Sequence, residues 1–334
     1  MNNNFKKLST GFLGFCVLLS TVCCGKANGE NNITKDNGVP TQNASISESN
    51  TKEDSQLSTS LNNDSGTPSQ AQMPLNGNET ESSNRENVAS GMSEISKDIP
   101  LGVQALLKAY PDFIKGYENG YIIYSDGSKQ IYDDGKEKDF DTLLDNSSLK
   151  DMFYVAYEQP NGSPKYLMDA GRSRNEDFFK KMYGNSAAAV RKNLVTVNWL
   201  GQNVTFTNIN GAADQLKKVA AELAKRPDLK KYLKSSGTFY WRKVRGANRQ
   251  SAHSYGIAFD IGVDNSDYWL WKNPKAKETD KIKYANRMPK DIVDIFEKYG
   301  FIWGGSWYHF DTMHFEYRPE ILYYSQLYKE NEGK

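Results

Sequence analysis

The three histidines of this chain fall into two short segments that also carry carboxylates. His253 shares the first segment with Asp260, and His309 and His314 share the second, nearer the C-terminus, with Asp311. Histidines scattered over a surface would not gather in this way. Two imidazoles and one carboxylate are a normal ligand set for a catalytic zinc ion, whose fourth position holds water. The sequence therefore predicts a metal site built from two separated pieces of chain, with Asp311 as a spare carboxylate near that water.

A short strand is expected to present Asp260. Residues 257–263 alternate with period two, which places Asp260 between the small residues Ala258 and Gly262 on one face and leaves room beside its carboxylate. The opposite face is apolar and consists of Ile257, Phe259, Ile261 and Val263. Gly256 lies between His253 and this strand, where we expect the chain to turn.

The second segment alternates in the same way over residues 313–317. Met313, Phe315 and Tyr317 are expected to point inward, and His314 and Glu316 outward. Asp311 then falls where this strand begins. Glu316 shares a face with His314, so it either hydrogen-bonds a ligand imidazole and fixes its tautomer or is a plain charge on the strand.

The pattern Ser-x-His-x-x-Gly-x-x-x-Asp, followed downstream by Asp-x-x-His-x-Glu, resembles that of the zinc D-Ala-D-Ala peptidases. That family includes the vancomycin-resistance dipeptidase and carboxypeptidase and the phage L-alanyl-D-glutamate endolysins. The similarity is strongest from about Gly237 to Pro319 and extends back to about Asn193. The resemblance implies an α+β fold of the D-Ala-D-Ala peptidase/hedgehog-like type, in which a small antiparallel sheet with flanking helices carries the zinc site.

By this resemblance, His253, Asp260 and His314 are the ligands of Zn²⁺, and Asp311 is the general base. Many relatives have Glu at the base position, so the shorter Asp is a departure that affects its reach. His309 does not correspond to a ligand of the family, and we expect it in a surface role or supporting the ligands.

The same resemblance points to an arginine that could hold substrate. In the family, a strand that ends in an arginine precedes the first histidine; here a strand is expected over residues 237–244, and the arginine is most like Arg242. A guanidinium there would hold a substrate carbonyl or carboxylate, although a structural salt bridge is an equal alternative. The family's Tyr-Arg-Ser…Gln segment is not reproduced, and Arg245 and Arg249 are weaker candidates.

Two further arginines, Arg172 and Arg174, precede a helix expected to run through Tyr183. They would either bind a substrate carboxylate or form ordinary ion pairs at a solvated helix start, which we favour. Aromatic residues over 267–271 would line the cleft or pack in the core. Trp307 and Tyr308 are expected to wall the site.

The chain divides by composition into four parts. Residues 1–24 carry Lys6 and Lys7 before an apolar run that ends in Cys23-Cys24, which indicates a signal segment. The cysteines at its end favour a lipoprotein over a protein that is simply secreted. Residues 25–97 are polar and lack aromatics, which predicts a disordered tether. Residues 98–192 would form an accessory part, and residues 193–330 the zinc peptidase domain.

Periodicity and turn residues predict the other elements of the folded part. The expected helices cover 103–113, 142–152, 212–224, 228–233 and 291–299, with a hairpin over 120–135 turning at Asp126-Gly127 and a second hairpin from strands 193–200 and 204–209.

Composition narrows the classes of function. All three cysteines lie in the signal region, which excludes a cysteine peptidase. The net charge of +1 gives no argument for nucleic acid. Neither a Gly-x-Ser-x-Gly elbow nor a His-Glu-x-x-His motif occurs.

Family resemblance and export together imply an extracytoplasmic, monomeric enzyme of the bacterial envelope acting on peptidoglycan stem peptides. D-alanyl-D-alanine carboxypeptidase is expected first and L-alanyl-D-glutamate endopeptidase second. The alternative from another class is a non-catalytic wall-binding lipoprotein on the same fold. Contact with a membrane is expected only through an N-terminal lipid anchor.

Overall fold

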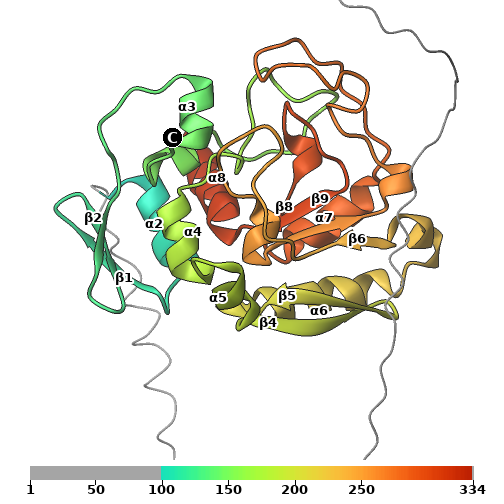
Figure 1. Ribbon diagram of the computed structural model, residues 1–334, viewed down its shortest axis with the longest axis horizontal. Helices are drawn as coiled ribbons and strands as arrows, with labels where there is room; N and C mark the ends of the chain where they lie inside the picture. The colour runs from blue at the N-terminus through green and yellow to red at the C-terminus, as the bar shows by residue number, and fades with distance from the viewer. Residues whose placement is uncertain (1–98, 333–334) are drawn as a thin grey trace, which may run out of the picture. The chain divides into compact units, whose positions relative to one another are not determined.

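Residues 99–332 are the part of the chain that the structure, a computed structural model, describes. Within this range the chain forms an α+β fold in which small antiparallel sheets are flanked by helices (Figure 1). The predicted signal segment (1–24) and tether (25–97) lie outside the described residues. The predicted boundary at residue 193 stays a prediction, and one apolar core runs through the chain on both sides of it.

The elements have the following bounds. The α-helices are α2 (Leu101–Ala109), α3 (Phe140–Asp145), α4 (Glu176–Tyr183), α5 (Ala187–Arg191), α6 (Ala212–Leu223), α7 (Lys290–Lys298) and α8 (Pro319–Glu332). The strands are β1 (Ile114–Glu118), β2 (Tyr121–Tyr124), β3 (Lys129–Ile131), β4 (Leu194–Trp199), β5 (Gln202–Thr207), β6 (Ser235–Gly237), β7 (Ala258–Ile261), β8 (Phe301–Trp303) and β9 (His314–Tyr317). Short 3₁₀ helices cover Lys150–Phe153, Ile209–Gly211, Pro227–Tyr232, Ala252–Tyr255, Val263–Asn265 and Gly304–Ser306.

Three sheets organise the described residues. Strands β1, β2 and β3 pair in chain order, β4 pairs with β5, and the third sheet has the order β6-β7-β9-β8. In Figure 1, α6 lies beside the β4–β5 hairpin and α7 beside β8, and both pairs are in contact. All neighbours in the third sheet are antiparallel, and its two central strands, β7 and β9, carry Asp260 and His314.

Aromatic packing fixes the two central strands. The ring of Phe259 on β7 meets Trp199 of β4 edge-on at 4.7 Å between centroids. Phe315 on β9 stacks on Phe296 of α7 at 4.0 Å. All four rings are fully buried or nearly so. Because side chains alternate along a strand, this packing turns the neighbours of Phe259 and Phe315 to the opposite face of the sheet.

Most of the predicted elements are confirmed. The hairpin over 120–135 forms between β2 and β3, and in its turn the backbone N–H of Ser128 donates to the carboxylate of Asp126. β4 and β5 form the second hairpin, and α6 and α7 start or end within a residue of the predicted bounds.

Several expectations about local structure were wrong. β6 ends at Gly237, so residues 238–244 are not a strand, and β7 ends at Ile261, which leaves Val263 exposed rather than in the core. The predicted helix over 142–152 divides into α3 and a 3₁₀ turn, and the one over 228–233 is a 3₁₀ helix. The strand β1 was not foreseen.

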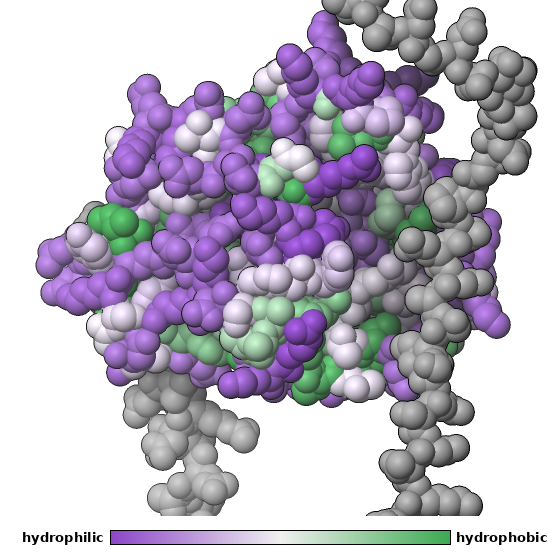
Figure 2. Space-filling model, viewed as in Figure 1, coloured by the Kyte–Doolittle hydropathy of each residue, from purple (hydrophilic) through white to green (hydrophobic). Residues whose placement is uncertain are grey.

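The surface is polar over most of the face shown in Figure 2, where hydrophobic side chains emerge only in separate patches. None of the helices formed by residues 99–332 has both the length and the apolar character required to cross a bilayer.

Candidate metal centre

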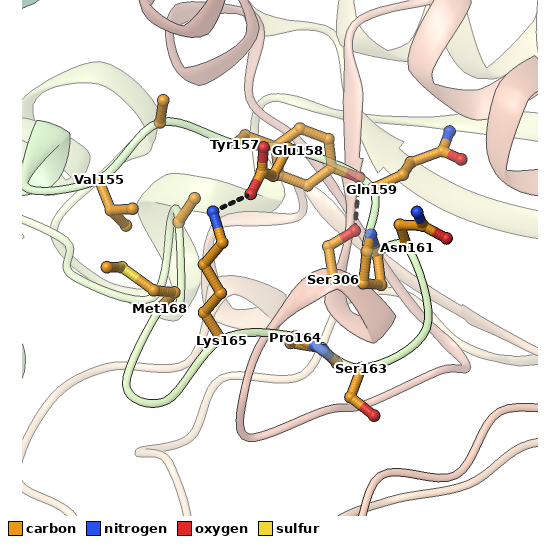
Figure 3. Close-up of a pocket in the computed structure, with 13 residues that line it drawn as sticks. Val155, Tyr157, Glu158, Gln159, Asn161, Ser163, Pro164, Lys165, Met168 and Ser306 are labelled. Atoms are coloured by element: carbon orange, nitrogen blue, oxygen red, sulfur yellow. Dashed lines mark hydrogen bonds and ion pairs between the residues drawn. The ribbon is translucent and has the colours of Figure 1, made fainter.

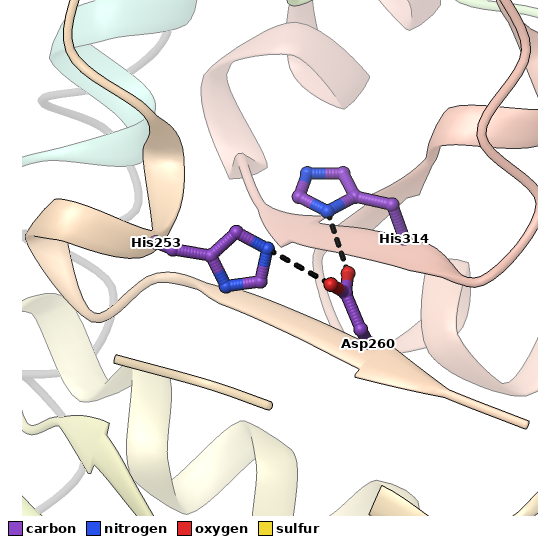
Figure 4. A group of neighbouring side chains, drawn as sticks. All are labelled: His253, Asp260 and His314. Carbon is purple, nitrogen blue, oxygen red and sulfur yellow. Dashed lines mark hydrogen bonds and ion pairs between the residues drawn. The ribbon is translucent and has the colours of Figure 1, made fainter. Parts of the chain in front are cut away.

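Asp260 and His314 face each other across two paired strands, and His253 approaches from the turn before the first strand. Asp260 on β7 is the register partner of His314 on β9. Asp260 Oδ1 lies 2.8 Å from His314 Nδ1, and Asp260 Oδ2 lies 3.2 Å from His253 Nε2 (Figure 4). The candidate ligand atoms of the three residues lie within 4.8 Å of one another. The structure thus brings the three predicted ligands together.

Two glycines make the path of the first segment feasible. Gly256 turns the chain at φ 67°, as expected, and a Cβ there would lie 2.5 Å from a side-chain carbon of Leu194. Gly262 ends β7 at φ 59°, where a Cβ would lie 2.4 Å from the backbone oxygen of Tyr232. Both positions need glycine because an L-residue with a side chain is strained at positive φ and would clash there.

In each imidazole, the ring nitrogen that points away from Asp260 donates a hydrogen bond to an acceptor. His253 Nδ1 donates to the carbonyl oxygen of Thr238 at 2.5 Å, and His314 Nε2 donates to Glu316 Oε1 at 3.0 Å. These bonds place the protons on the outer nitrogens and leave His253 Nε2 and His314 Nδ1 facing Asp260. This is how metal-binding histidines are usually oriented.

Glu316 belongs to a buried polar network. It is 1 % exposed and accepts hydrogen bonds from Arg174 Nη1 at 3.2 Å and Arg318 Nη1 at 3.0 Å, besides that from His314. Burial opposes its charge, but Arg174, His314 and Arg318 outweigh burial and hold the pKa of Glu316 well below its usual range. Of the two readings of Glu316, the hydrogen bond to a candidate ligand imidazole is the one the structure shows, and the side chain is buried rather than outward-facing.

The side chains of the centre also shift one another's pKa values. Burial opposes charge on Asp260, but its interactions with His253 and His314 hold the pKa of Asp260 well below its usual range. Burial disfavours protonation of His314, yet its hydrogen bonds to Asp260 and Glu316 raise the pKa of His314 to about 10. A metal ion requires the neutral imidazole, so metal binding would release a proton here.

Asp311 lies close to the three candidate ligands and carries a hydrogen-bond acceptor without a partner among the described residues. Its Oδ1 atom is buried and makes no hydrogen bond within residues 99–332. Burial raises the pKa of Asp311 to about 7, with a further contribution from the negative charge of Asp260. Buried polar atoms are rarely left unsatisfied, so this oxygen fits a position beside a water molecule or ligand group.

The donor set therefore fits a divalent cation such as zinc. The candidate ligand atoms of two imidazoles and one carboxylate lie within 4.8 Å of one another, which suits the usual ligand set of zinc. Asp311 lines the same cavity with an Oδ1 atom that accepts no hydrogen bond from residues 99–332.

A cavity of about 480 Å³ opens onto the centre. His253, Asp260, Asp311 and His314 all line it. Tyr268, Trp271 and Trp307 form aromatic walls, and Arg174, Arg242, Lys243 and Arg245 add positive charge. The ring of Trp307 lies 5.6 Å from that of His314, so this expected wall residue is in place.

Another cavity, of about 310 Å³, is lined mainly by residues 155–170 (Figure 3). It contains the Lys165–Glu158 ion pair and the hydrogen bond from Ser306 to Tyr157. None of the candidate ligands lines it, so the candidate reaction site is the cavity of about 480 Å³.

Arg242 is where sequence and structure diverge most. It is exposed on an irregular segment, and its guanidinium bonds only to the carbonyl oxygen of Lys243, at 3.3 Å, among the described residues. Arg242 is thus neither presented by a strand nor part of a salt bridge there, but it does line the cavity.

The other expected arginines are buried rather than solvated. Arg172 forms ion pairs with Asp169 at 2.6 Å and Glu278 at 2.9 Å, as favoured, but is only 9 % exposed. Arg249 pairs with Asp145 at 2.5 Å. Arg174 is 8 % exposed rather than solvated, and it lines the metal-site cavity, where the less favoured alternative of binding a substrate carboxylate would place it.

His309 is not a surface residue. It is 1 % exposed, and its imidazole lies between Asp169, at 2.5 Å from Nδ1, and Glu278, at 3.2 Å from Nε2. Tyr308 does not line the metal-site cavity; its hydroxyl donates to the carbonyl oxygen of Asp280 instead. Sequence reasoning missed Asp169 and Glu278, which carry no recognisable motif and meet these partners only in the fold.

Residues 245–317 match the family model described as D-alanyl-D-alanine carboxypeptidase. The matched segment contains His253, Asp260, Asp311 and His314. The match confirms the resemblance inferred from the motif pair and supports a peptidase. No curated protein and no solved structure matches the chain.

Proposed function

We propose that this protein is a zinc metallopeptidase acting on peptidoglycan stem peptides, with D-alanyl-D-alanine carboxypeptidase activity. The observation that carries the proposal is the convergence of His253, Asp260 and His314 in one cavity with Asp311, whose Oδ1 atom accepts no hydrogen bond from residues 99–332. The family match over residues 245–317 supports the reaction class.

In this proposal the chain's own residues divide the work. His253, Asp260 and His314 hold the ion. When bound, Zn²⁺ supplies a Lewis acid for the scissile carbonyl and lowers the pKa of a water molecule to roughly 7. Asp311 accepts a proton from the attacking water and returns it to the leaving amine. No protein nucleophile is needed.

The state of Asp311 suits this role. Burial, with a further contribution from the negative charge of Asp260, raises the pKa of Asp311 to about 7, and a divalent cation nearby favours the carboxylate form. A base with these properties is ionised at neutral pH and still takes up a proton readily.

Positive charge in the cavity is proposed to receive the substrate. Arg174 is fixed by its bond to Glu316 and faces the cavity from outside the family-matched segment. Arg242 is exposed at the cavity and free to reach a carboxylate or carbonyl oxygen of the peptide. We assign Arg242 to binding rather than to a rigid oxyanion site because its guanidinium makes only one hydrogen bond to the described residues, to the carbonyl oxygen of Lys243.

Location and partners belong to the proposal as well. The predicted lipoprotein signal, the tether and the monomeric state would place one catalytic unit near the envelope, where stem peptides occur.

Mass spectrometry of stem peptides after incubation with the full chain tests the proposal. Loss of one terminal D-Ala is the expected result, and internal cleavage between L-Ala and D-Glu would mark the endopeptidase instead. Asp311→Asn should lower the rate by about 10²- to 10⁴-fold, whereas Lys225→Gln, an exposed change outside the cavity, should not. Unchanged peptide masses with zinc-loaded protein would refute the activity.

A further inference from the structure

A smaller cavity of about 170 Å³ adjoins the metal-site cavity. Tyr268 and Trp271 line both, so these two side chains form the wall between them. We call the smaller one the side cavity. Its floor is apolar, with Trp269 and Phe310 both less than 10 % exposed.

Three lysines give the side cavity its charge. Lys272, Lys281 and Lys283 line it, and all three are exposed. None forms a salt bridge with a residue of the described range, whereas the one acidic residue of the lining, Asp267, is engaged by Arg287 at 3.1 Å. The side cavity therefore offers an apolar floor beneath uncompensated positive charge, which suits the side chain of an acidic residue.

The loop that builds the side cavity is tied to the body of the protein. Glu278 accepts two hydrogen bonds from Arg172, each of 2.9 Å. The hydroxyl of Tyr308 bonds the backbone of residues 280 and 282 at 2.9 Å each. Tyr284 donates to the carbonyl oxygen of Gly305 at 3.0 Å. These contacts fix the backbone of the segment that carries Lys281 and Lys283 before a ligand arrives, which lowers the ordering cost of binding.

The shared wall is also tied to Asp311. Tyr268 and Asp311 are partners in an isolated antiparallel bridge, and the backbone N–H of Trp269 donates to the carbonyl oxygen of Phe310 at 3.0 Å. A ligand that spans the wall would thus lie beside the segment that carries the proposed base.

From this arrangement we propose that the side cavity is a second subsite, which binds a carboxylate side chain of the peptide substrate at a distance from the scissile bond. The inference rests on the proposed peptidase function and deepens it. The enzyme then prefers anionic peptides long enough to cross Tyr268 and Trp271, and short neutral peptides fill only the metal-site cavity.

Peptides of one length that end in D-Ala-D-Ala, with glutamate or glutamine at successive upstream positions, test the subsite. Binding is measured with zinc-loaded Asp311→Asn full-length protein, by calorimetry at low and high salt, and cleavage is measured with the parent. At one or more positions the glutamate peptide should bind about 3- to 10-fold more tightly than its glutamine twin, and salt should reduce the difference.

Matched charge variants locate the effect. Lys281→Gln/Lys283→Gln should abolish the preference for glutamate, whereas Lys225→Gln/Lys230→Gln, a pair of exposed lysines outside both cavities, should leave it unchanged. Equal binding of the twin peptides, or a preference that survives the first pair of substitutions, would overturn the inference. So would a single-stranded oligonucleotide that binds more tightly than every peptide and displaces it.

The binding arm separates this inference from the proposed function. If the parent cleaves no peptide while the glutamate preference persists and depends on Lys281 and Lys283, the proposed activity fails and the subsite stands. If the parent cleaves glutamate and glutamine peptides with equal kcat/KM and binds them equally, the activity stands and the subsite fails.

Discussion

Replacing Glu316 by glutamine tests whether the buried network supports the metal centre. Glutamine keeps the size of the side chain but removes its charge and turns one acceptor into a donor. In the structure, three donors converge on Glu316 at 3.0 to 3.2 Å: Arg174, Arg318 and His314. Two of them are buried guanidinium groups that would lose a countercharge.

The structure sets the size of the effect. Removing one partner of a buried ion pair costs roughly 3–5 kcal/mol because the other charge stays buried. In a folded unit of this size that corresponds to a fall of about 6–20 °C in Tm. Loss of the negative charge that supports the His314 imidazole should also weaken zinc binding by about 10- to 100-fold.

The pH dependence has a defined sign. Since the pKa of Glu316 is lowered in the fold, its stabilising contribution is complete above its unfolded pKa of about 4.3. That contribution is lost as pH falls below this value towards the folded pKa. The difference in stability between the parent and Glu316→Gln should therefore narrow in acid.

Urea denaturation with a chelator present gives the stability, and a competitive zinc titration of folded protein gives the affinity. Glu137→Gln, which alters an exposed carboxylate with no salt bridge to a described residue, serves as control. If Glu316→Gln matches the control in both measurements, the network does not support the centre. Reduced stability with unchanged zinc affinity would refute only the part of the reasoning that concerns His314.

Two further predictions concern stability. In chelator, Asp311→Asn should be more stable than the parent at pH 8, and the gain should shrink towards pH 5, because the folded carboxyl with its pKa of about 7 is then neutral; a parent at least as stable at pH 8, in urea denaturation, would contradict this. Gly262→Ala should cost at least about 1 kcal/mol more than Gly211→Ala. Both positions have φ between 59° and 69°, but only at Gly262 would the methyl meet a backbone oxygen, at 2.4 Å; equal denaturation midpoints would show that the close contact is relieved.

The sequence could predict the centre because its residues depend on local pattern. Asp260 and His314 each lie in a strand whose alternation decides the face, and Gly256 marks the turn that brings His253 to them. The spacing of these residues therefore predicted most of the arrangement of the centre, including the position of the Asp311 carboxylate in the same cavity.

What the sequence could not give depends on contacts between distant segments. Arg174 looks solvated among polar neighbours, yet it is buried because Glu316, far along the chain, receives it. The same holds for His309, which Asp169 and Glu278 enclose. The strand expected over 237–244 failed for another reason: β6 ends at Gly237, which has φ 148°, and the following residues form backbone bonds to the turn of His253 instead.

Zinc content is the most direct test of the central claim that His253, Asp260 and His314 hold one ion. The purified full chain, incubated with zinc and dialysed, should retain about one Zn²⁺ per molecule by elemental mass spectrometry. His253→Ala, shown to be folded by circular dichroism, should retain far less, and Lys225→Gln should match the parent. A parent without zinc, or a His253→Ala variant that retains as much as the parent, would contradict the account.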